Sequence, residues 1–207
     1  MDTFLRWAIH GKHMSFHIRA TTLNDEGQIL HLYQKVAKKP GGLARIEQEI
    51  TTQYIRHNLI QAQKSGIGLV ASDDLKQIVG EIHCYRLEPL VFRHVLSELT
   101  IAIHPDFQGQ GIGKALFQTL LKQIETHFPD VFRVELIARE SNQKAILFYQ
   151  QLGFITEGKM HGRILNHHHQ LEADVMMAWF NASFSPNNPA VAIDAVPFAY
   201  RMESNPK

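Results

Sequence analysis

The chain has 207 residues, of which 44% are apolar and 20% are charged, as is typical of a soluble globular protein with a substantial core. Its 21 Lys and Arg residues nearly balance its 20 Asp and Glu residues, which gives a formal net charge of +1. This balance favours neither nucleic acid nor an anionic membrane as a partner, and the length allows one substantial domain or two small ones.

The apolar segments indicate neither export nor a membrane span. Residues 1–17 lack the apolar core of about 7–15 residues that follows the basic start of a secretion signal. No segment reaches the ~18 apolar residues expected of a membrane helix. The single cysteine, Cys84, lies within the apolar run 78–85, which predicts a small buried side chain rather than a reactive thiol. We therefore expect a cytoplasmic protein.

Strand and helix patterns alternate through the first third of the chain. A short strand is predicted over residues 16–19, and Thr22 is the predicted N-cap of a helix that ends near Ala37. The sequence Pro-Gly-Gly at 40–42 ends this helical pattern. Apolar residues at helical spacing then predict a second helix over residues 43–64.

The remaining elements follow from alternation, helical spacing and turn residues. Further helices are predicted from near Gly111 to Phe128 and from a cap at Ser141 to Leu152. Further strands are predicted over residues 67–71, 77–87, 94–104, 131–138, 154–157 and 172–180. The order β-α-α-β-β-β-α-β-α-β-β indicates a mixed α/β (α+β) sheet of about seven strands with four helices.

The last part of the chain differs in composition from the rest. Residues 1–180 are predicted to form a single domain, and residues 181–207 a C-terminal extension with four prolines and poor periodicity. Two alternatives stay open for this extension. It is either a mobile segment or an extended segment that packs along an edge of the domain.

The segment with the clearest chemistry is the connection from the strand at 94–104 to the helix that begins near Gly111. Glycines at 109, 111 and 113 allow positive φ and close approach of a ligand to the main chain. The N–H groups of the first helical turn have no partners within the helix, and the helix dipole adds partial positive charge. This combination suits a pyrophosphate, although a turn of this kind is also often only a tight connection.

Two familiar nucleotide-binding patterns fit this turn poorly. The dinucleotide fingerprint requires G-x-G-x-x-G, whereas the glycines here are spaced G-x-G-x-G. The P-loop requires Ser or Thr after its lysine, whereas Ala115 follows Lys114, and the loop length from Gly109 also differs.

The same segment resembles the central motif of the GNAT superfamily of N-acetyltransferases, whose core is Q/R-x-x-G-x-G/A. The matching residues are Gln108 to Gly113. Residues 141–154, with an Asn near a helix start followed by Tyr-x-x-Leu-Gly-Phe, are similar to the second signature of the family. The resemblance covers roughly residues 16–180 and implies a GNAT-like fold that uses acetyl-CoA as cosubstrate.

The resemblance also implies which residues contact the cofactor. Asn142 would bond the pantetheine amides, or alternatively cap its helix. The main chain of Ile101, Ala102 and Ile103 would pair with the pantetheine arm, and a main-chain N–H near Ile103 would polarise the thioester carbonyl. The pyrophosphate would be held by the N–H groups of Gln108, Gly109, Gln110, Gly111, Ile112, Gly113 and Lys114.

Two residues are the candidates for acid–base chemistry. Tyr149 matches the family's general acid, which protonates the departing thiolate; the alternative is a tyrosine that only packs its helix. An alkyl amine with a pKa of ~10.4 is almost entirely protonated at pH 7, so a base is needed. Glu98 is the first candidate, with a structural carboxylate as the alternative, and Glu81 and His104 are lesser candidates.

The predicted function is transfer of an acetyl group from acetyl-CoA to a primary amine, by direct attack in a ternary complex. The alternative is a non-catalytic acyl-CoA-binding or regulatory module on the same fold. No metal is expected, because the run His167 to His169 lies in a connection and lacks a recognised ligand spacing. The acceptor is a small-molecule amine or a protein amine, and homodimers are common in the family.

Overall fold

The structure is a computed structural model that describes residues 5–7, 15–39, 43–166 and 168–185. It divides into two compact units. Among the described residues, the first unit comprises those up to Tyr85 together with Thr100–Leu121, and the second comprises Arg86–Leu99 together with those from Lys122 onward. One strand and one helix therefore begin in one unit and end in the other.

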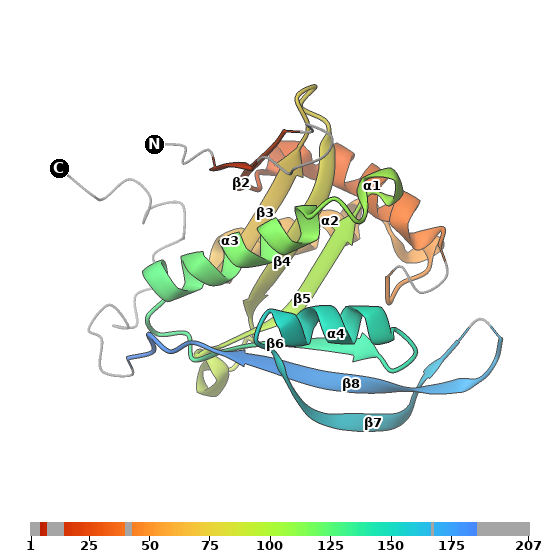
Figure 1. Ribbon diagram of the computed structural model, residues 1–207, viewed down its shortest axis with the longest axis vertical. Helices are drawn as coiled ribbons and strands as arrows, with labels where there is room; N and C mark the ends of the chain where they lie inside the picture. Colours follow the sequence, from red (N-terminus) through yellow and green to blue (C-terminus); the bar gives the residue numbers. More distant parts are fainter. Residues whose placement is uncertain (1–4, 8–14, 40–42, 167, 186–207) are drawn as a thin grey trace. The chain divides into compact units, whose positions relative to one another are not determined.

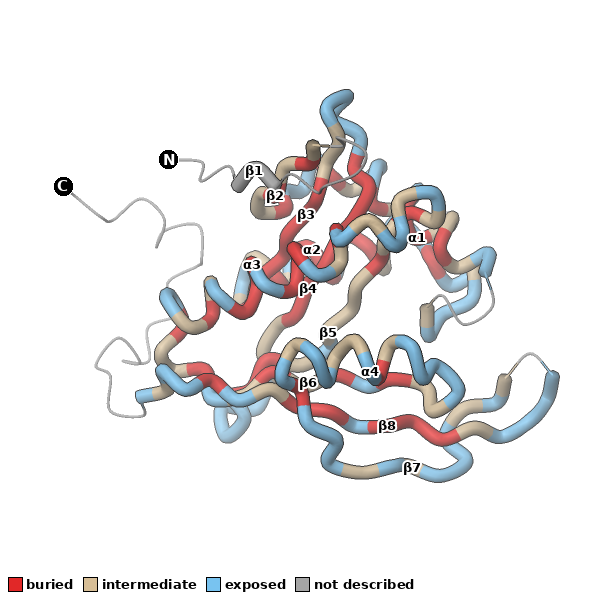
Figure 2. The backbone as a smooth tube through the Cα atoms, in the orientation of Figure 1, coloured by how far each residue is buried: buried red, intermediate tan, exposed pale blue. Residues whose placement is uncertain are grey.

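The first unit is built on antiparallel strands. β1 (Leu5–Trp7) pairs with β2 (Phe16–Ala20), β2 pairs with β3 (Gly66–Ser72), and β3 pairs with β4 (Ile78–Arg86). The last part of β5 (Val95–Ile103) belongs to the same unit and neighbours β4. β3 and β4 are buried along almost their whole length, as Figure 2 shows.

Helices cover both faces of these strands (Figure 1). On one face lie α1 (Glu26–Ala37) and α2 (Thr52–Ser65), and their apolar sides form a core with the strands. The buried members of this core are Ile29, Leu32, Tyr33, Val36, Ile50, Ile55, Leu59, Val70, Ile78 and Ala102. On the other face lies the first half of α3 (Ile112–His127). A Cβ at Gly80 would lie 3.1 Å from α3 side-chain atoms, so glycine permits this close packing.

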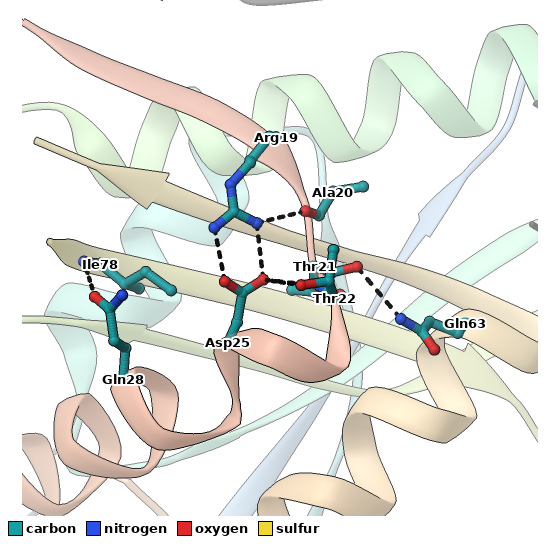
Figure 3. A network of polar contacts seen from close by, with 8 residues as sticks. All are labelled: Arg19, Ala20, Thr21, Thr22, Asp25, Gln28, Gln63 and Ile78. Atoms are coloured by element: carbon teal, nitrogen blue, oxygen red, sulfur yellow. Dashed lines mark hydrogen bonds and ion pairs between the residues drawn. The ribbon is translucent and has the colours of Figure 1, made fainter. Parts of the chain in front are cut away.

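A polar network anchors the start of α1 to the neighbouring strand (Figure 3). Arg19 donates to both carboxylate oxygens of the buried Asp25, each at 2.7 Å, and the N–H of Thr22 donates to the same carboxylate at 2.8 Å. Burial alone would raise the pKa of Asp25, but these donors outweigh burial and hold the pKa below 3.8. The carboxylate therefore stabilises the fold as an anion.

The second unit is a smaller mixed sheet. The start of β5 pairs in parallel with β6 (Arg133–Arg139), and β6 pairs antiparallel with β8 (Leu171–Phe180) along its whole length. β7 (Ile155–Leu165) forms a long hairpin with β8 (Figure 1). α4 (Gln143–Gln151) and the end of α3 supply the α-helical residues of this unit.

The chain after β8 packs onto the second unit as far as it is described. The side chain of Asn181 is buried and donates to the carbonyl of Val131 at 2.9 Å, and the N–H of Ser185 donates to the carbonyl of Pro129 at 2.8 Å. The ring of Phe184 lies 5.1 Å from that of Phe132. Residues 186–207, which make up most of the predicted extension, lie outside the described residues. The single domain over 1–180 stays a prediction.

All seven predicted strands and all four predicted helices are present in the predicted order. The strand β1 is additional. The start of the second helix was predicted wrongly, because α2 begins at Thr52 and not at residue 43. Residues 43–51 form a loop with one 3₁₀ turn. From this loop Leu43 packs on the core and Ile50 is buried, whereas Ile46 is exposed.

The predicted start of α4 and the predicted end of β7 were also wrong, and the hydrogen bonds of the structure explain both differences. Asn142, and not Ser141, caps α4, since its side chain accepts from the N–H of Ala145 at 3.2 Å. The hydroxyl of Ser141 instead donates to Glu172 at 2.9 Å. β7 extends well past the predicted end at residue 157, because its pairing with β8 continues to Leu165. Within the described residues, no helix is long and apolar enough for a membrane span.

Replacement of Asp25 by Asn tests the network at the start of α1. We expect the free energy of unfolding to fall by about 1–3 kcal/mol at pH 7, because hydrogen bonds to a charged group are lost. The stabilisation by the carboxylate is fully present above the ordinary Asp pKa of ~3.9 and is lost as the pH falls through the lower folded-state pKa. Urea titrations of both proteins at pH 7 and at pH 3 measure the difference.

The control is Glu26→Gln, which removes a carboxylate that pairs with the exposed Arg56. A solvent-exposed pair of this kind contributes little to stability, so this variant should change the free energy of unfolding little at either pH. If Asp25→Asn lowers stability equally at pH 7 and pH 3, the ionised carboxylate is not the source of the stabilisation.

Candidate active site

The glycine turn has the geometry that its sequence predicts. β5 ends at Ile103, a 3₁₀ turn follows over Pro105–Phe107, and α3 begins at Ile112. Gly109 and Gly111 have φ angles of 76° and 81°, which lie in the left-handed region. A Cβ at Gly109 would meet no atom within 4 Å, so its φ angle, and not lack of space, requires glycine there.

The main-chain donors of the turn are left without main-chain acceptors. The N–H groups of Phe107 and Gln108 bond to the carbonyls of His104 and Pro105, and the N–H of Ala115 makes the first helical bond, to Gly111 at 3.0 Å. In the part of the chain that the structure describes, the N–H groups of 109–111 have no such bond, and those of 112–114 belong to the first helical turn. This row of donors lies at the positive end of a 16-residue helix.

The glutamine side chains of the turn brace it from within. Gln108 Nε2 donates to the carbonyl of Ile103 at 3.1 Å, and Gln110 Nε2 donates to the carbonyl of Asp106 at 3.0 Å. Both side chains satisfy carbonyl groups and leave the N–H groups unpaired. Lys114 is exposed and can add positive charge next to the donors.

His104 fixes the start of the turn, a role that the sequence did not indicate. The buried imidazole accepts from the N–H of Asp106 through Nδ1 at 3.3 Å, and its Nε2 lies 3.1 Å from Lys35 Nζ. Burial and the charge of Lys35 lower the pKa of His104, so the ring stays uncharged at neutral pH. His104 is therefore a structural cap here.

The strand that leads into the turn is anchored through both of its faces. Ala102 is buried in the core under α1 and α2. The side chains of Ile101 and Ile103 face the opposite way, and each would lie 3.8 Å from a Cβ placed at Gly113. The structure thus brings the predicted cofactor residues 101–103 and 108–114 together within the first unit.

Glu98 lies in the middle of β5, in the second unit, with its side chain exposed. Its φ angle is 53°, which is unusual for a residue with a side chain and marks a local irregularity of the strand. A conformation of this kind costs about 1–3 kcal/mol and is found preferentially at functional sites. The backbone at Glu98 is therefore consistent with a functional role.

Asn142 and Tyr149 lie on α4 in the second unit. The capping bond occupies the side-chain oxygen of Asn142, and the amide nitrogen is its remaining polar group. Tyr149 is half-buried, with its ring 5.6 Å from that of Phe148 and 6.1 Å from that of Phe154. Burial raises the pKa of Tyr149 to about 12, so its hydroxyl keeps its proton at neutral pH.

The residues considered for metal or thiol chemistry lie in a turn and in the core. Among the described residues, no group of three or more His, Cys, Asp or Glu side chains is placed to hold a metal ion. His168 and His169 lie in the turn that joins β7 to β8, while His167 lies outside the described residues. Cys84 is fully buried, and burial raises the pKa of its thiol to about 12, which confirms the predicted buried side chain.

The sequence matches a family model over residues 20–154, and that family is the acetyltransferase (GNAT) family. This match covers more than half of the chain. The fold, the glycine turn at the start of α3 and this match together define the class, which is a GNAT-type acyltransferase. The chain belongs to the GNAT acetyltransferase family.

Curated relatives share a short segment with the chain. The [ribosomal protein bS18]-alanine N-acetyltransferase of Escherichia coli is 43% identical over 63 residues, which cover 29% of this chain and 41% of that protein. The uncharacterized N-acetyltransferase ycf52 of Gracilaria tenuistipitata var. liui is 42% identical over 57 residues, which cover 28% of this chain and 29% of that protein. The chain thus spans less than half the length of these relatives.

Solved structures confirm the GNAT fold. A GNAT-family acetyltransferase from Streptococcus pneumoniae has a TM-score of 0.71 at 19% identity and covers 80% of this chain and 99% of that one. A phosphinothricin acetyltransferase from Sinorhizobium meliloti, in complex with AcCoA, has a TM-score of 0.72 at 16% identity. The match covers 87% of this chain and 97% of that one. The Escherichia coli ribosomal-protein-S18-alanine N-acetyltransferase has a TM-score of 0.66 at 21% identity. The match covers 84% of this chain and 98% of that one.

Replacement of Gly109 by Ala tests whether the turn depends on its left-handed backbone. We expect the variant to lose about 1–2 kcal/mol of unfolding free energy, because Ala resists positive φ. The control is Gly27→Ala at an exposed, helical position of α1, which should raise stability by up to about 1 kcal/mol. Urea titration of the two variants measures both effects, and equal shifts would contradict a strained turn.

Proposed function

We propose that this protein transfers the acetyl group of acetyl-CoA to a primary amine, by direct attack within a ternary complex. The observation that carries the proposal is the row of main-chain N–H groups at 109–114, which face no main-chain acceptor at the positive end of α3. Such a row is suited to the doubly charged pyrophosphate of CoA. Membership of the GNAT family supports the same cosubstrate.

The rest of acetyl-CoA would be held by groups on β5 and α4. The main chain of Ile101 and Ala102 and the N–H of Ile103 would pair with the pantetheine arm, since Gln108 already occupies the Ile103 carbonyl. The amide nitrogen of Asn142 would donate to a pantetheine carbonyl. A main-chain N–H near Ile103 would polarise the thioester carbonyl as negative charge develops on its oxygen.

The proposed proton transfers use two side chains. As the C–N bond forms, Glu98 takes a proton from the attacking nitrogen, directly or through water. As the C–S bond breaks, the hydroxyl of Tyr149 donates to the sulfur, and the proton released by the nitrogen finally resides on the CoA thiol. The pKa of about 12 keeps Tyr149 protonated until charge develops on the sulfur.

The acceptor is a primary amine on a small molecule or on a protein. The bS18-alanine N-acetyltransferases among the relatives favour a protein α-amine as one candidate. An α-amine, with a pKa of ~7.7–8.0, also needs less help from a base than an alkyl amine does. A thiol-release assay with acetyl-CoA and a panel of peptides, amino acids and polyamines identifies the class.

Comparison of acetyl-CoA with S-acetylpantetheine tests the phosphate site. Because S-acetylpantetheine lacks the pyrophosphate, we expect its Kd to be at least about tenfold higher by calorimetry. Lys114→Ala should weaken acetyl-CoA binding by a factor of about 3 or less, since this side chain is exposed. Equal affinity for the two thioesters would remove the glycine turn from the binding site.

Replacement of Tyr149 by Phe tests the proposed acid. We expect kcat to fall by a factor of about 10²–10⁴ while the Kd for acetyl-CoA changes less than about twofold, because only the proton donor is lost. Tyr54→Phe, on α2, is the control and should keep full turnover. Unchanged turnover in Tyr149→Phe would show that the Tyr149 hydroxyl has no part in the mechanism. If the unmodified protein binds acetyl-CoA but releases no thiol with any amine, the protein is instead a non-catalytic acyl-CoA-binding module.

A further inference from the structure

His104 occupies the junction between β5 and the glycine turn. It follows the last residue of β5, and its carbonyl accepts from the N–H of Phe107 at 2.9 Å. Its own N–H donates to the carbonyl of Val79 on β4 at 2.9 Å. Its ring lies edge to face against that of Phe107, with the centroids 5.3 Å apart. The backbone and the side chain of His104 therefore both fix the place where the strand becomes the turn.

The ring of His104 points away from the proposed phosphate site. Along β5, Ala102 is buried under α1 and α2, whereas Ile103 faces Gly113 on α3. Successive side chains of a strand alternate between its two faces, so His104 lies on the same face as Ala102. The contact of the ring with Lys35 of α1 agrees with this side. The ring therefore acts on a bound phosphate through the backbone of the turn.

Both ring nitrogens of His104 face hydrogen-bond donors. The N–H of Asp106 donates to Nδ1 at 3.3 Å, and Lys35 Nζ lies 3.1 Å from Nε2. A neutral imidazole has one nitrogen that accepts, and an imidazolium has none. A second proton on the ring therefore removes the acceptor for the N–H of Asp106. It also places a positive charge 3.1 Å from the amino group of Lys35.

Three charged or titratable groups act on the His104 ring from the elements around it. The ring is 6% exposed, and its burial together with the charge of Lys35 holds the pKa of His104 below 6.5. The exposed His31, one helical turn before Lys35 on α1, acts in the same direction. The carboxylate of Asp106, 3.8 Å from Nδ1, acts in the opposite direction from a solvent-exposed position. His104 is therefore neutral at pH 7 and takes up a proton in mildly acidic solution.

The bond from Asp106 to the His104 ring is linked to the row of free donors. The carbonyl of Asp106 accepts from Gln110 Nε2 at 3.0 Å, and this bond braces the segment 109–111 whose N–H groups are unpaired. Release of the Asp106 N–H from the ring frees the backbone at this residue. A movement of the Asp106 backbone shifts the acceptor of Gln110 and, with it, the donors on either side of Gln110.

We propose that the neutral His104 ring positions the glycine turn for acetyl-CoA, and that uptake of a proton by this ring loosens the turn and weakens acetyl-CoA binding. The inference rests on the proposed function and adds a dependence on pH to its phosphate site. Acetyl-CoA that binds the protonated form displaces one proton from His104 to solvent. His104 is thus a positioning residue, and mild acidification lowers the occupancy of the protein by its cosubstrate.

The charge of the imidazolium has an opposite effect, which is the smaller one. A positive charge near the turn attracts the phosphates of CoA and by itself strengthens binding in acid. The His104 ring, however, lies on the face of β5 that α1 covers, and α3 lies on the other face (Figure 1). The N–H groups of the turn contact the anion directly, so the loss of their geometry outweighs an attraction that acts across the strand.

The Kd for acetyl-CoA, measured by calorimetry between pH 5 and pH 8, tests the proposal. His104→Asn is the reference protein, because the Asn oxygen can accept from the N–H of Asp106 but takes up no proton in this range. The phosphate monoester of CoA titrates near pH ~6, and it does so equally for both proteins. At pH 8 the two Kd values should agree within about threefold. At pH 5 the unmodified protein should have a Kd at least about threefold above that of His104→Asn.

Matched variants separate this role from others. His104→Ala removes the acceptor of the Asp106 N–H at every pH and should weaken binding throughout the range. Lys35→Met removes the charge beside Nε2, which raises the pKa of His104, so the weakening should begin at a higher pH than in the unmodified protein. His31→Gln should retain the weakening, because the titrating ring is still present. Circular dichroism at each pH distinguishes a loosened turn from an unfolded protein.

Two results from these titrations overturn the proposal. One is a Kd of His104→Asn that rises in acid as steeply as that of the unmodified protein. The other is loss of the pH dependence in His31→Gln, which would assign the titration to His31. If the folded, unmodified protein binds no acetyl-CoA at any pH, the proposed function itself is refuted instead.

One measurement on the unmodified protein does not depend on the folding of any variant. Nitrogen–proton correlation spectra of the imidazole groups, recorded over the same pH range, follow the protonation of His104 directly. Because acetyl-CoA binds the neutral form more tightly, the pKa of His104 should be lower in the complex than in the free protein. A higher pKa in the complex would show that the added attraction prevails, and it overturns the proposal.

Discussion

The proposed function depends on one local constraint, which is that the main-chain donors before and in the first turn of α3 stay unpaired. The surrounding residues keep them so by satisfying carbonyl groups instead. Gln108 and Gln110 donate their side-chain amides to the carbonyls of Ile103 and Asp106, and Gly109 and Gly111 turn the backbone through the left-handed region. The donors are therefore preorganised for an anion, and little reorganisation is needed when it binds.

The sequence predicts this turn well because all of its determinants are local. Glycine spacing, a preceding strand and a following amphipathic helix lie within one short segment, and the structure keeps their order. The stretch from residue 43 to Thr51 shows the opposite case. Its apolar residues have helical spacing, but the capping bond from Tyr54 N–H to Thr51 and the burial of Ile50 from a loop fix a later helix start. Tertiary packing decided that boundary.

Only the parts of the candidate site that are encoded by short sequence motifs could be predicted. The φ angle of 53° at Glu98 leaves no mark in the sequence, since any residue can stand in a strand irregularity. The Tyr33–Glu81–His83 cluster joins residues about 50 positions apart, so it needed the packing of α1 on β4. One signal was nevertheless present. Glu81 and His83 alternate on one face of an otherwise apolar strand, a pattern that predicts a buried polar pair.

Glu98 and Glu81 differ in their exposure, and therefore in the roles that each can serve. An exposed carboxylate on an irregular strand is within reach of water and of an incoming molecule, as the proposed base has to be. The Glu81 carboxylate is only 2% exposed, and it is contacted by the hydroxyl of Tyr33 and by Nδ1 of His83. Because a buried carboxylate without hydrogen-bond partners is costly, these two contacts offset the cost of placing Glu81 in the core.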